Sequence, residues 1–278
     1  ELPEVETVRR GLAAVLEGRD LVRVRAMRPD LRFPLPKDFE KILAGRHVET
    51  LGRRGKFLLI HLENRLTLIA HLGMSGRFRI FKGPPPALER HDHVVFEVDS
   101  GVCVRFNDPR RFGFMDFCET EALYDHKMLK KMGPEPLANA FNGPVLAAVL
   151  KGRKSPIKAA LLDQSVLAGM GNIYVSEALF RAGLSPKRKS GTVQGGRAEK
   201  LAHAIKDVLN EAIAAGGSSL KDHRQPSGEL GYFQHSFAVY GRAGQPCPGC
   251  DCDRERTGGI RRITQSGRAT FYCAAKQR

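Results

Sequence analysis

The chain has 278 residues, which is long enough for two domains with separate cores. Lysine and arginine outnumber aspartate and glutamate by 45 to 30, so the formal net charge is +15 and the sequence pI is near 9.8. This balance favours a polyanion partner, nucleic acid first, and the sequence has no signal peptide, basic amphipathic anchor or apolar run of about eighteen residues. We therefore expect a soluble, intracellular protein.

The chain opens with ELPEVETVRRGL, in which Val5, Val8 and Leu12 recur at helical spacing and charged residues fill the other positions. This pattern predicts an amphipathic helix. Because the apolar stripe starts so close to Glu1, we expect the α-amino group to be held against a core. An α-amino group with a pKa of about 7.7 to 8.0 is roughly one-tenth neutral at pH 7, and neutral amines form Schiff bases with aldehydic carbons. The alternative is a helix that only stabilises the start of the fold.

The next hundred residues contain short apolar or alternating runs, separated by closely spaced turn residues. The runs are LVRVRAM, KFLLIHL, RLTLIAHL, GRFRIF, HVVFEV, VCVRF and GFMDFC. Such a series predicts an antiparallel β-sandwich.

Two turns between the predicted strands carry large side chains, which is unusual for turn tips. Met74 lies in HLGMSG, and Arg110 and Phe112 lie in NDPRRFG. Proteins that flip a base out of duplex DNA fill the resulting hole with apolar or planar cationic side chains. The turns therefore suggest a wedge, although Met74 alone also fits a core position. His91 in ERHDH is either an ordinary loop histidine or a phosphate contact.

After MGPEPLANAFNGP, which contains three prolines and breaks the strand pattern, residues 145–215 have helical periodicity. The glycine turn in LAGMGNIYVSEALF places Asn172 at the start of a helix, where backbone N–H groups can bind phosphate. GRKSPIK adds Lys154 and Lys158, and the loop GGSSLKD adds Lys221. The alternative is a turn that only joins two helices, with solvated lysines on exposed faces, a description that suits Lys158.

The C-terminal segment contains clustered cysteines, which indicate a metal site and not disulfides. Cys247 and Cys250 form a C-x-x-C pair, and Cys273 follows in RATFYC. Lys276 stands where a regular zinc ribbon has its fourth cysteine, so we expect one zinc ion per chain with Cys252 as the substitute ligand. A metal-free hairpin is the alternative. Three arginines of this segment suit phosphate contact: Arg261, Arg262 and Arg268.

From end to end the chain resembles the bacterial formamidopyrimidine-DNA glycosylase family. The matching stretches are ELPEVETVRRGL, RRGKFLL, HLGMSG, RHDH, NDPRRFG, GMGNIYVSE, GGSSLKD, VYGRAGQPC and RATFYC. The resemblance implies an α+β multidomain protein. Its parts would be an N-terminal helix with a β-sandwich over residues 1–130, a helix-two-turn-helix domain over 131–240 and a zinc-finger hairpin over 241–278. It also implies that double-stranded damaged DNA is bound between two lobes, and we expect a monomer.

The activity implied by the resemblance is base-excision repair: release of oxidised purines such as 8-oxoguanine and formamidopyrimidines, then strand cleavage by β,δ-elimination. The sister group, endonuclease VIII, prefers oxidised pyrimidines and is the second choice. Four residues resemble the purine branch: Leu2, Met74, Arg110 and Phe112. A zinc-ribbon nucleic-acid-binding protein without base chemistry is a further alternative.

The resemblance also assigns catalytic roles. The family's mature chain begins with a proline, its Schiff-base nucleophile, directly before the glutamate that matches Glu1. We expect the recorded sequence to begin one residue after this proline; a chain that truly starts at Glu1 would favour a non-catalytic damaged-DNA binder. Glu1 matches the general acid, Lys56 a lysine used in proton transfer and phosphate contact, and Arg268 the finger arginine of the δ step.

Further residues match the family's DNA contacts. The match assigns DNA binding to His91, Arg110, Lys154 and Asn172, and void filling to Met74, Arg110 and Phe112. The loop with Lys221 resembles the segment that closes over the extruded base. The finger departs from the family at Lys276 and in the insertion DCDRER after Cys250.

Overall fold

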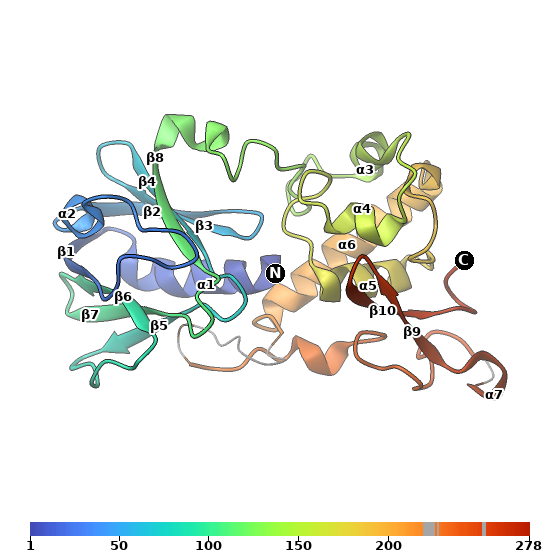
Figure 1. The fold of residues 1–278 in the computed structure, drawn as a ribbon. Coiled ribbons are helices and arrows are strands. Elements are labelled where there is room, and N and C mark those ends of the chain that lie inside the picture. The colour runs from blue at the N-terminus through green and yellow to red at the C-terminus, as the bar shows by residue number, and fades with distance from the viewer. Residues whose placement is uncertain (219–225, 227, 252–253) are drawn as a thin grey trace. The chain divides into compact units, whose positions relative to one another are not determined.

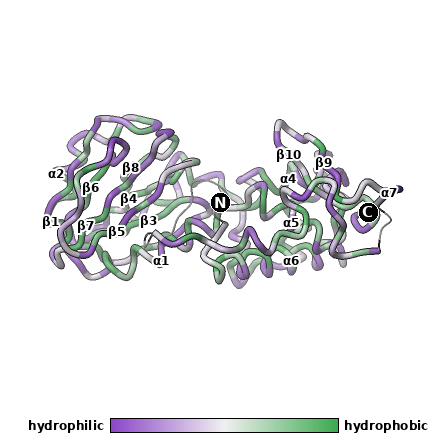
Figure 2. The backbone as a smooth tube through the Cα atoms, turned by 90° about the horizontal axis from the view of Figure 1, so that it is seen from below, coloured by the Kyte–Doolittle hydropathy of each residue, from purple (hydrophilic) through white to green (hydrophobic). Residues whose placement is uncertain are grey.

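The computed structural model describes residues 1–218, 226, 228–251 and 254–278. The described chain forms two compact units. The sandwich unit comprises residues 3–130 and 215–234, and the helical unit comprises residues 1–2, 131–214 and 235–278. Hydrophobic stretches occur in both units (Figure 2), and each has buried apolar residues of its own.

The sandwich unit is built from eight antiparallel strands in the order β5-β7-β6-β1-β2-β3-β4-β8 (Figure 1). Its elements are α1 (Leu2–Leu16), β1 (Arg19–Ala26), α2 (Phe39–Leu43), β2 (His47–Arg54), β3 (Phe57–Leu62), β4 (Leu66–His71), β5 (Arg77–Lys82), β6 (Asp92–Val98), β7 (Val102–Asn107), β8 (Phe114–Glu119) and η1 (Thr120–Asp125). Strand β1 joins the two layers, because it pairs with β6 along most of its length and with β2 only at Arg19 and Asp20. The predicted β-sandwich is confirmed.

The apolar stripe of α1 is part of the sandwich core. Val5, Val8 and Leu12 are buried in one cluster with residues of both layers, including Leu58 of β3 and Val94 of β6. The helical periodicity of the first residues therefore has the predicted cause, a single face turned toward a core.

Strand β2 is an element that the sequence pattern did not reveal. Its sequence, HVETLGRR, has only Val48 and Leu51 buried. The pairing with β3 is irregular between Val48 and Thr50, which breaks the alternation of buried and exposed residues. A two-residue periodicity cannot detect a strand whose register changes within it.

The second half of the chain is mainly helical, as predicted. It contains α3 (Gly143–Leu150), α4 (Ile157–Leu162), α5 (Asn172–Arg181), η2 (Ser190–Thr192), α6 (Gly196–Ala214), η3 (Phe233–Ser236), α7 (Arg254–Thr257), β9 (Ile260–Gln265) and β10 (Arg268–Cys273). Asn142 caps α3 by accepting a hydrogen bond from Val145 N at 3.0 Å. Strands β9 and β10 form an antiparallel hairpin. Among the described helices, none combines the length and the apolar character needed to cross a bilayer.

Candidate active site

Glu1 is held at the N-terminus of α5 within the helical unit. Leu2 N donates to Gly169 O at 3.1 Å, and Glu1 Oε1 accepts from Ile173 N at 3.3 Å. A Cβ atom at Gly171 would collide with the Glu1 side chain, so a larger residue there would displace Glu1. The partial positive charge of a helix N-terminus favours a carboxylate there. In this structure the turn that the sequence suggested for phosphate therefore holds Glu1.

The environment of Lys158 differs from the one that the sequence suggested. The description of Lys158 as a solvated lysine is wrong, because its residue is only 1 % exposed. Its Nζ donates to Ala269 O at 2.8 Å and to Thr270 Oγ1 at 2.7 Å. Burial lowers the pKa of Lys158 to about 8, the charge of Arg268 adds to this effect, and Glu1 opposes it. The one feature of the sequence that pointed to the burial of Lys158 was its position in the apolar helix IKAALL.

The Ala269 carbonyl joins two helices to the C-terminal hairpin. It accepts hydrogen bonds from Lys158 and from Asn172 Nδ2, the latter at 3.0 Å. Ala269 directly follows Arg268, which is exposed at the start of β10. Helices α4 and α5 thus fix the backbone beside the predicted catalytic arginine. Lys154 is exposed in the loop between α3 and α4.

Three cysteines of the helical unit lie close enough to hold one metal ion. The sulfur atoms of Cys247, Cys250 and Cys273 are all within 4.8 Å of one another. Gly249 N donates to Cys247 Sγ at 3.4 Å. Burial raises the pKa of Cys273, but hydrogen bonds from the backbone N–H groups that follow it, including that of Lys276, and from the neighbouring thiols outweigh burial and lower the pKa. Clustered sulfurs that accept amide hydrogen bonds fit a zinc site.

Lys276 packs beside this cluster. Its Nζ lies 4.1 Å from the centre of the Phe180 ring, a cation–π contact with α5. A Cβ atom at Gly249 would collide with the same ammonium group. The described residues therefore offer three sulfur ligands, and Lys276 contributes packing. Cys252 and Lys221 lie outside the described residues.

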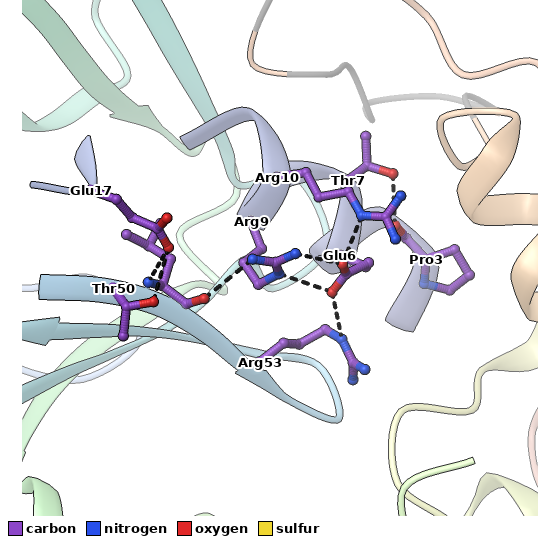
Figure 3. A network of polar contacts seen from close by, with 9 residues as sticks. Pro3, Glu6, Thr7, Arg9, Arg10, Glu17, Thr50 and Arg53 are labelled. Carbon is purple, nitrogen blue, oxygen red and sulfur yellow. Dashed lines mark hydrogen bonds and ion pairs between the residues drawn. The ribbon is translucent and has the colours of Figure 1, made fainter. Parts of the chain in front are cut away.

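In the sandwich unit, Lys56 lies in the turn between β2 and β3, which is anchored to α1. The anchor is the buried carboxylate of Glu6 (Figure 3). It accepts hydrogen bonds from three guanidinium groups, those of Arg9, Arg10 and Arg53. Burial raises the pKa of Glu6, yet these guanidinium groups hold the pKa below its ordinary value. Arg53 also donates to Gly55 O at 3.1 Å, so the network fixes the residue directly before Lys56.

His71 is a second anchor that the sequence did not reveal. Its Nδ1 accepts a hydrogen bond from Gly73 N at 3.0 Å, and its ring stacks on Phe114 with centroids 5.5 Å apart. Burial lowers the pKa of His71 to about 4, and the charges of Lys56 and Arg32 act in the same direction. His71 is therefore neutral near pH 7 and can accept this hydrogen bond, which fixes the start of the following turn.

The predicted void-filling side chains lie on two turns that contact each other. Met74 is 64 % exposed and Phe112 is 43 % exposed, so the alternative of a core position for Met74 is wrong. The guanidinium carbon of Arg110 lies 4.8 Å from the centre of the Phe112 ring. A Cβ atom at Gly73 would collide with the backbone of Phe112, which shows how closely the turns approach.

A hollow of about 480 Å³ adjoins the second of these turns. It is lined by Asp30, Leu31, Arg32, Arg110, Arg111 and Phe112. Three of these six residues are arginines, so the hollow suits an anionic or hydrogen-bonding group. His91 is half-buried in the same unit, and its carbonyl oxygen accepts from Asp108 N at 3.0 Å.

Comparison with known proteins gives matches over almost the whole chain. Residues 1–115 match the formamidopyrimidine-DNA glycosylase N-terminal domain, and residues 132–224 match the formamidopyrimidine-DNA glycosylase H2TH domain. The formamidopyrimidine-DNA glycosylase of Rhodospirillum centenum is 59 % identical over 288 residues, covering 100 % of this chain and 99 % of the relative. That of Rhodospirillum rubrum is 58 % identical over 281 residues, with the same coverage.

Solved structures agree with these matches. The MutM (Fpg) protein of Thermus thermophilus is 40 % identical, with a TM-score of 0.86 and coverage of 100 % of this chain and 98 % of that one. The Lactococcus lactis Fpg in complex with DNA containing an abasic site is 31 % identical, with a TM-score of 0.89 and coverage of 100 % and 99 %. A complex of the Lactococcus lactis protein with DNA containing Fapy-dG gives a TM-score of 0.88 at 31 % identity, with 100 % of each chain covered.

Proposed function

The chain belongs to the formamidopyrimidine-DNA glycosylase family, and from this membership we propose that it excises oxidised purines from double-stranded DNA in base-excision repair. The resemblance recognised in the sequence is thereby confirmed. Relatives with more than half of their residues identical carry this name, and the solved neighbours include complexes with abasic-site and Fapy-dG DNA. Cleavage of the strand, a monomeric state, a cytoplasmic location at the nucleoid and domains over 1–130, 131–240 and 241–278 belong to the same proposal.

The observation that best supports the chemistry is the placement of Glu1. Glu1 is half-buried, and Ile173 N at the start of α5 orients its carboxylate. A general acid must be fixed within hydrogen-bonding distance of the atom it protonates. A side chain held by a helix N-terminus and packed against Gly171 has little freedom to leave that geometry.

In the proposed reaction, the nitrogen of a proline directly before Glu1 attacks C1′ of the damaged nucleoside. The C1′–base bond breaks, and the departing base takes up a proton that balances the one lost by the attacking nitrogen. Glu1 protonates the sugar ring oxygen, the bond between C1′ and this oxygen breaks, and the nitrogen and C1′ form an iminium cation. Loss of a C2′ proton then expels the 3′ phosphate by β-elimination, and loss of the C4′ proton expels the 5′ phosphate by δ-elimination. The iminium cation accepts the released electrons in both steps. Lys56 assists proton transfer, and Arg268 binds phosphate in the last step.

We propose that side chains of both units share the binding of DNA. We assign phosphate contacts to His91, Lys154, Asn172 and Lys221, with Arg110 contacting the duplex. Met74, Arg110 and Phe112 fill the void left by the extruded base. The two turns that carry these three side chains support the assignment, because they expose an apolar, a cationic and an aromatic group side by side.

The experiment that tests this function uses duplexes with a single 8-oxoguanine or a single oxidised pyrimidine. We expect base release and strand scission on the 8-oxoguanine duplex, with slower reaction on the oxidised pyrimidine. The opposite preference would indicate specificity of the endonuclease VIII type. Binding of either duplex without base release would indicate a non-catalytic damaged-DNA binder.

We also propose that the cysteine cluster holds one zinc ion, with Cys252 as the fourth ligand. Structural zinc sites are closed by four protein ligands, and three sulfurs are already gathered. When bound, the ion would fix the hairpin that carries Arg268. Metal analysis should give about one zinc per chain in the wild type and much less in Cys252→Ser. Equal zinc in both proteins would exclude Cys252, and a zinc-free wild type would mean that packing alone holds the hairpin.

A further inference from the structure

Asp108 is the first residue of one of the two turns that carry the predicted wedge. We call residues 72–76 the Met74 turn and residues 108–113 the Phe112 turn. Asp108 is 0 % exposed, whereas the side chains of Met74 and Phe112 are open to solvent. A fully buried carboxylate is costly unless hydrogen bonds satisfy it, so its partners indicate what it holds in place.

The Asp108 carboxylate connects the two turns directly. Its Oδ1 accepts a hydrogen bond from Ser75 Oγ at 2.5 Å, and its Oδ2 accepts from Gly113 N at 2.8 Å. Ser75 Oγ in turn accepts from Arg110 N at 3.1 Å. A short path of hydrogen bonds therefore joins the residue after Met74 to the backbone on both sides of Phe112.

Close packing removes the remaining freedom of the two turns. Gly73 has φ of +65°, and a Cβ atom there would collide with the backbone of Phe112 and Gly113. At Gly113, a Cβ atom would meet Phe106 and the His71 carbonyl oxygen. The turns can therefore move relative to each other only if this contact opens.

The backbone of Asp108 extends the same anchor to the segment with His91. Asp108 N donates to His91 O at 3.0 Å, and Asp108 O accepts from the buried His93 Nε2 at 2.9 Å. Asp108 O also accepts from Arg111 N at 3.2 Å. One residue thus connects three segments that carry proposed DNA contacts.

We propose that Asp108 and Ser75 are positioning residues that hold Met74, Arg110 and Phe112 ready to enter the duplex, and that they thereby set the preference for lesion-containing over undamaged DNA. The inference rests on the proposed function, because it needs these side chains to be the wedge. Groups ordered before binding lose less conformational entropy when they insert, so the anchor should favour the complex in which insertion occurs. The anchor should add little to the affinity for undamaged duplex, which is bound without insertion of these side chains.

The test is a double-mutant cycle between Ser75→Ala and Phe112→Ala. Binding is measured to two duplexes of one sequence, one with a tetrahydrofuran abasic analogue and one undamaged. We expect Ser75→Ala to reduce the preference for the abasic duplex about fivefold, the effect of one buried hydrogen bond, with binding to undamaged DNA unchanged. In the Phe112→Ala background, Ser75→Ala should have little further effect. Asp108→Asn, which keeps one acceptor oxygen, should reproduce the loss.

Thr67→Ala is the matched control. Thr67 is also a fully buried hydroxyl residue of the sandwich unit, hydrogen-bonded to Thr120 and His61 at the other end of β4. It should lower the melting temperature without changing the preference for the lesion. The inference is overturned if Ser75→Ala and Asp108→Asn keep the wild-type preference, or if Ser75→Ala has an equal effect in both backgrounds. A wild type without any preference would instead overturn the proposed function.

Discussion

Glu1→Gln should lower the rate of base release by about 10² to 10⁴ and leave binding to lesion DNA nearly unchanged. The amide has almost the same shape as the carboxylate and can still accept the hydrogen bond from Ile173 N at 3.3 Å. It cannot supply an acidic proton to the sugar oxygen. A loss in the chemical step with retained affinity would identify Glu1 as a proton donor.

The measurement is single-turnover release of 8-oxoguanine, with affinity for the same duplex determined in parallel. Glu121→Gln is the matched control, because Glu121 lies on η1 and is an exposed carboxylate paired with Arg65. It should behave like the wild type. If Glu1→Gln lost affinity and rate to the same degree, Glu1 would be a binding or structural group.

Much of the fold follows from local patterns in the sequence. The apolar stripe of α1, the alternating strands and the helices after residue 143 all have the periodicity that their burial requires. Strand β2 was missed because its register shift near Thr50 disturbs that periodicity. A local sequence pattern thus predicts helices and strands in which buried and exposed residues alternate regularly. It misses a strand whose pairing with its neighbour is irregular.

The candidate site could be predicted less completely than the fold. Residues such as Glu1, Lys56 and Arg268 were assigned through the family resemblance, and their roles remain proposals. The groups that hold the site in place could not be recognised: Lys158 beside Arg268, and Asp108 at the turns of Met74 and Phe112. Both depend on partners distant in the sequence. Lys158 meets Ala269 and Thr270 of the hairpin, whereas a sequence alone shows a lysine near other lysines. Such hydrogen-bond partners can be recognised only from the three-dimensional structure.

The central claim is that an N-terminal amine beside Glu1 carries the reaction through a Schiff base. Borohydride reduces an iminium to a stable amine, so it converts the intermediate into a covalent protein–DNA adduct. The protein to use has proline directly before Glu1, and its control retains an additional methionine before that proline. In the control the proline nitrogen is an amide and cannot form the iminium.

Trapping on an 8-oxoguanine duplex, followed by intact-mass analysis, is therefore the most direct test. We expect an adduct approaching one DNA strand per protein, attached at the N-terminal proline, and essentially none with the methionine-extended control. Base release by the proline-bearing protein without any adduct would contradict the account, because the glycosidic bond would then be broken without a covalent intermediate.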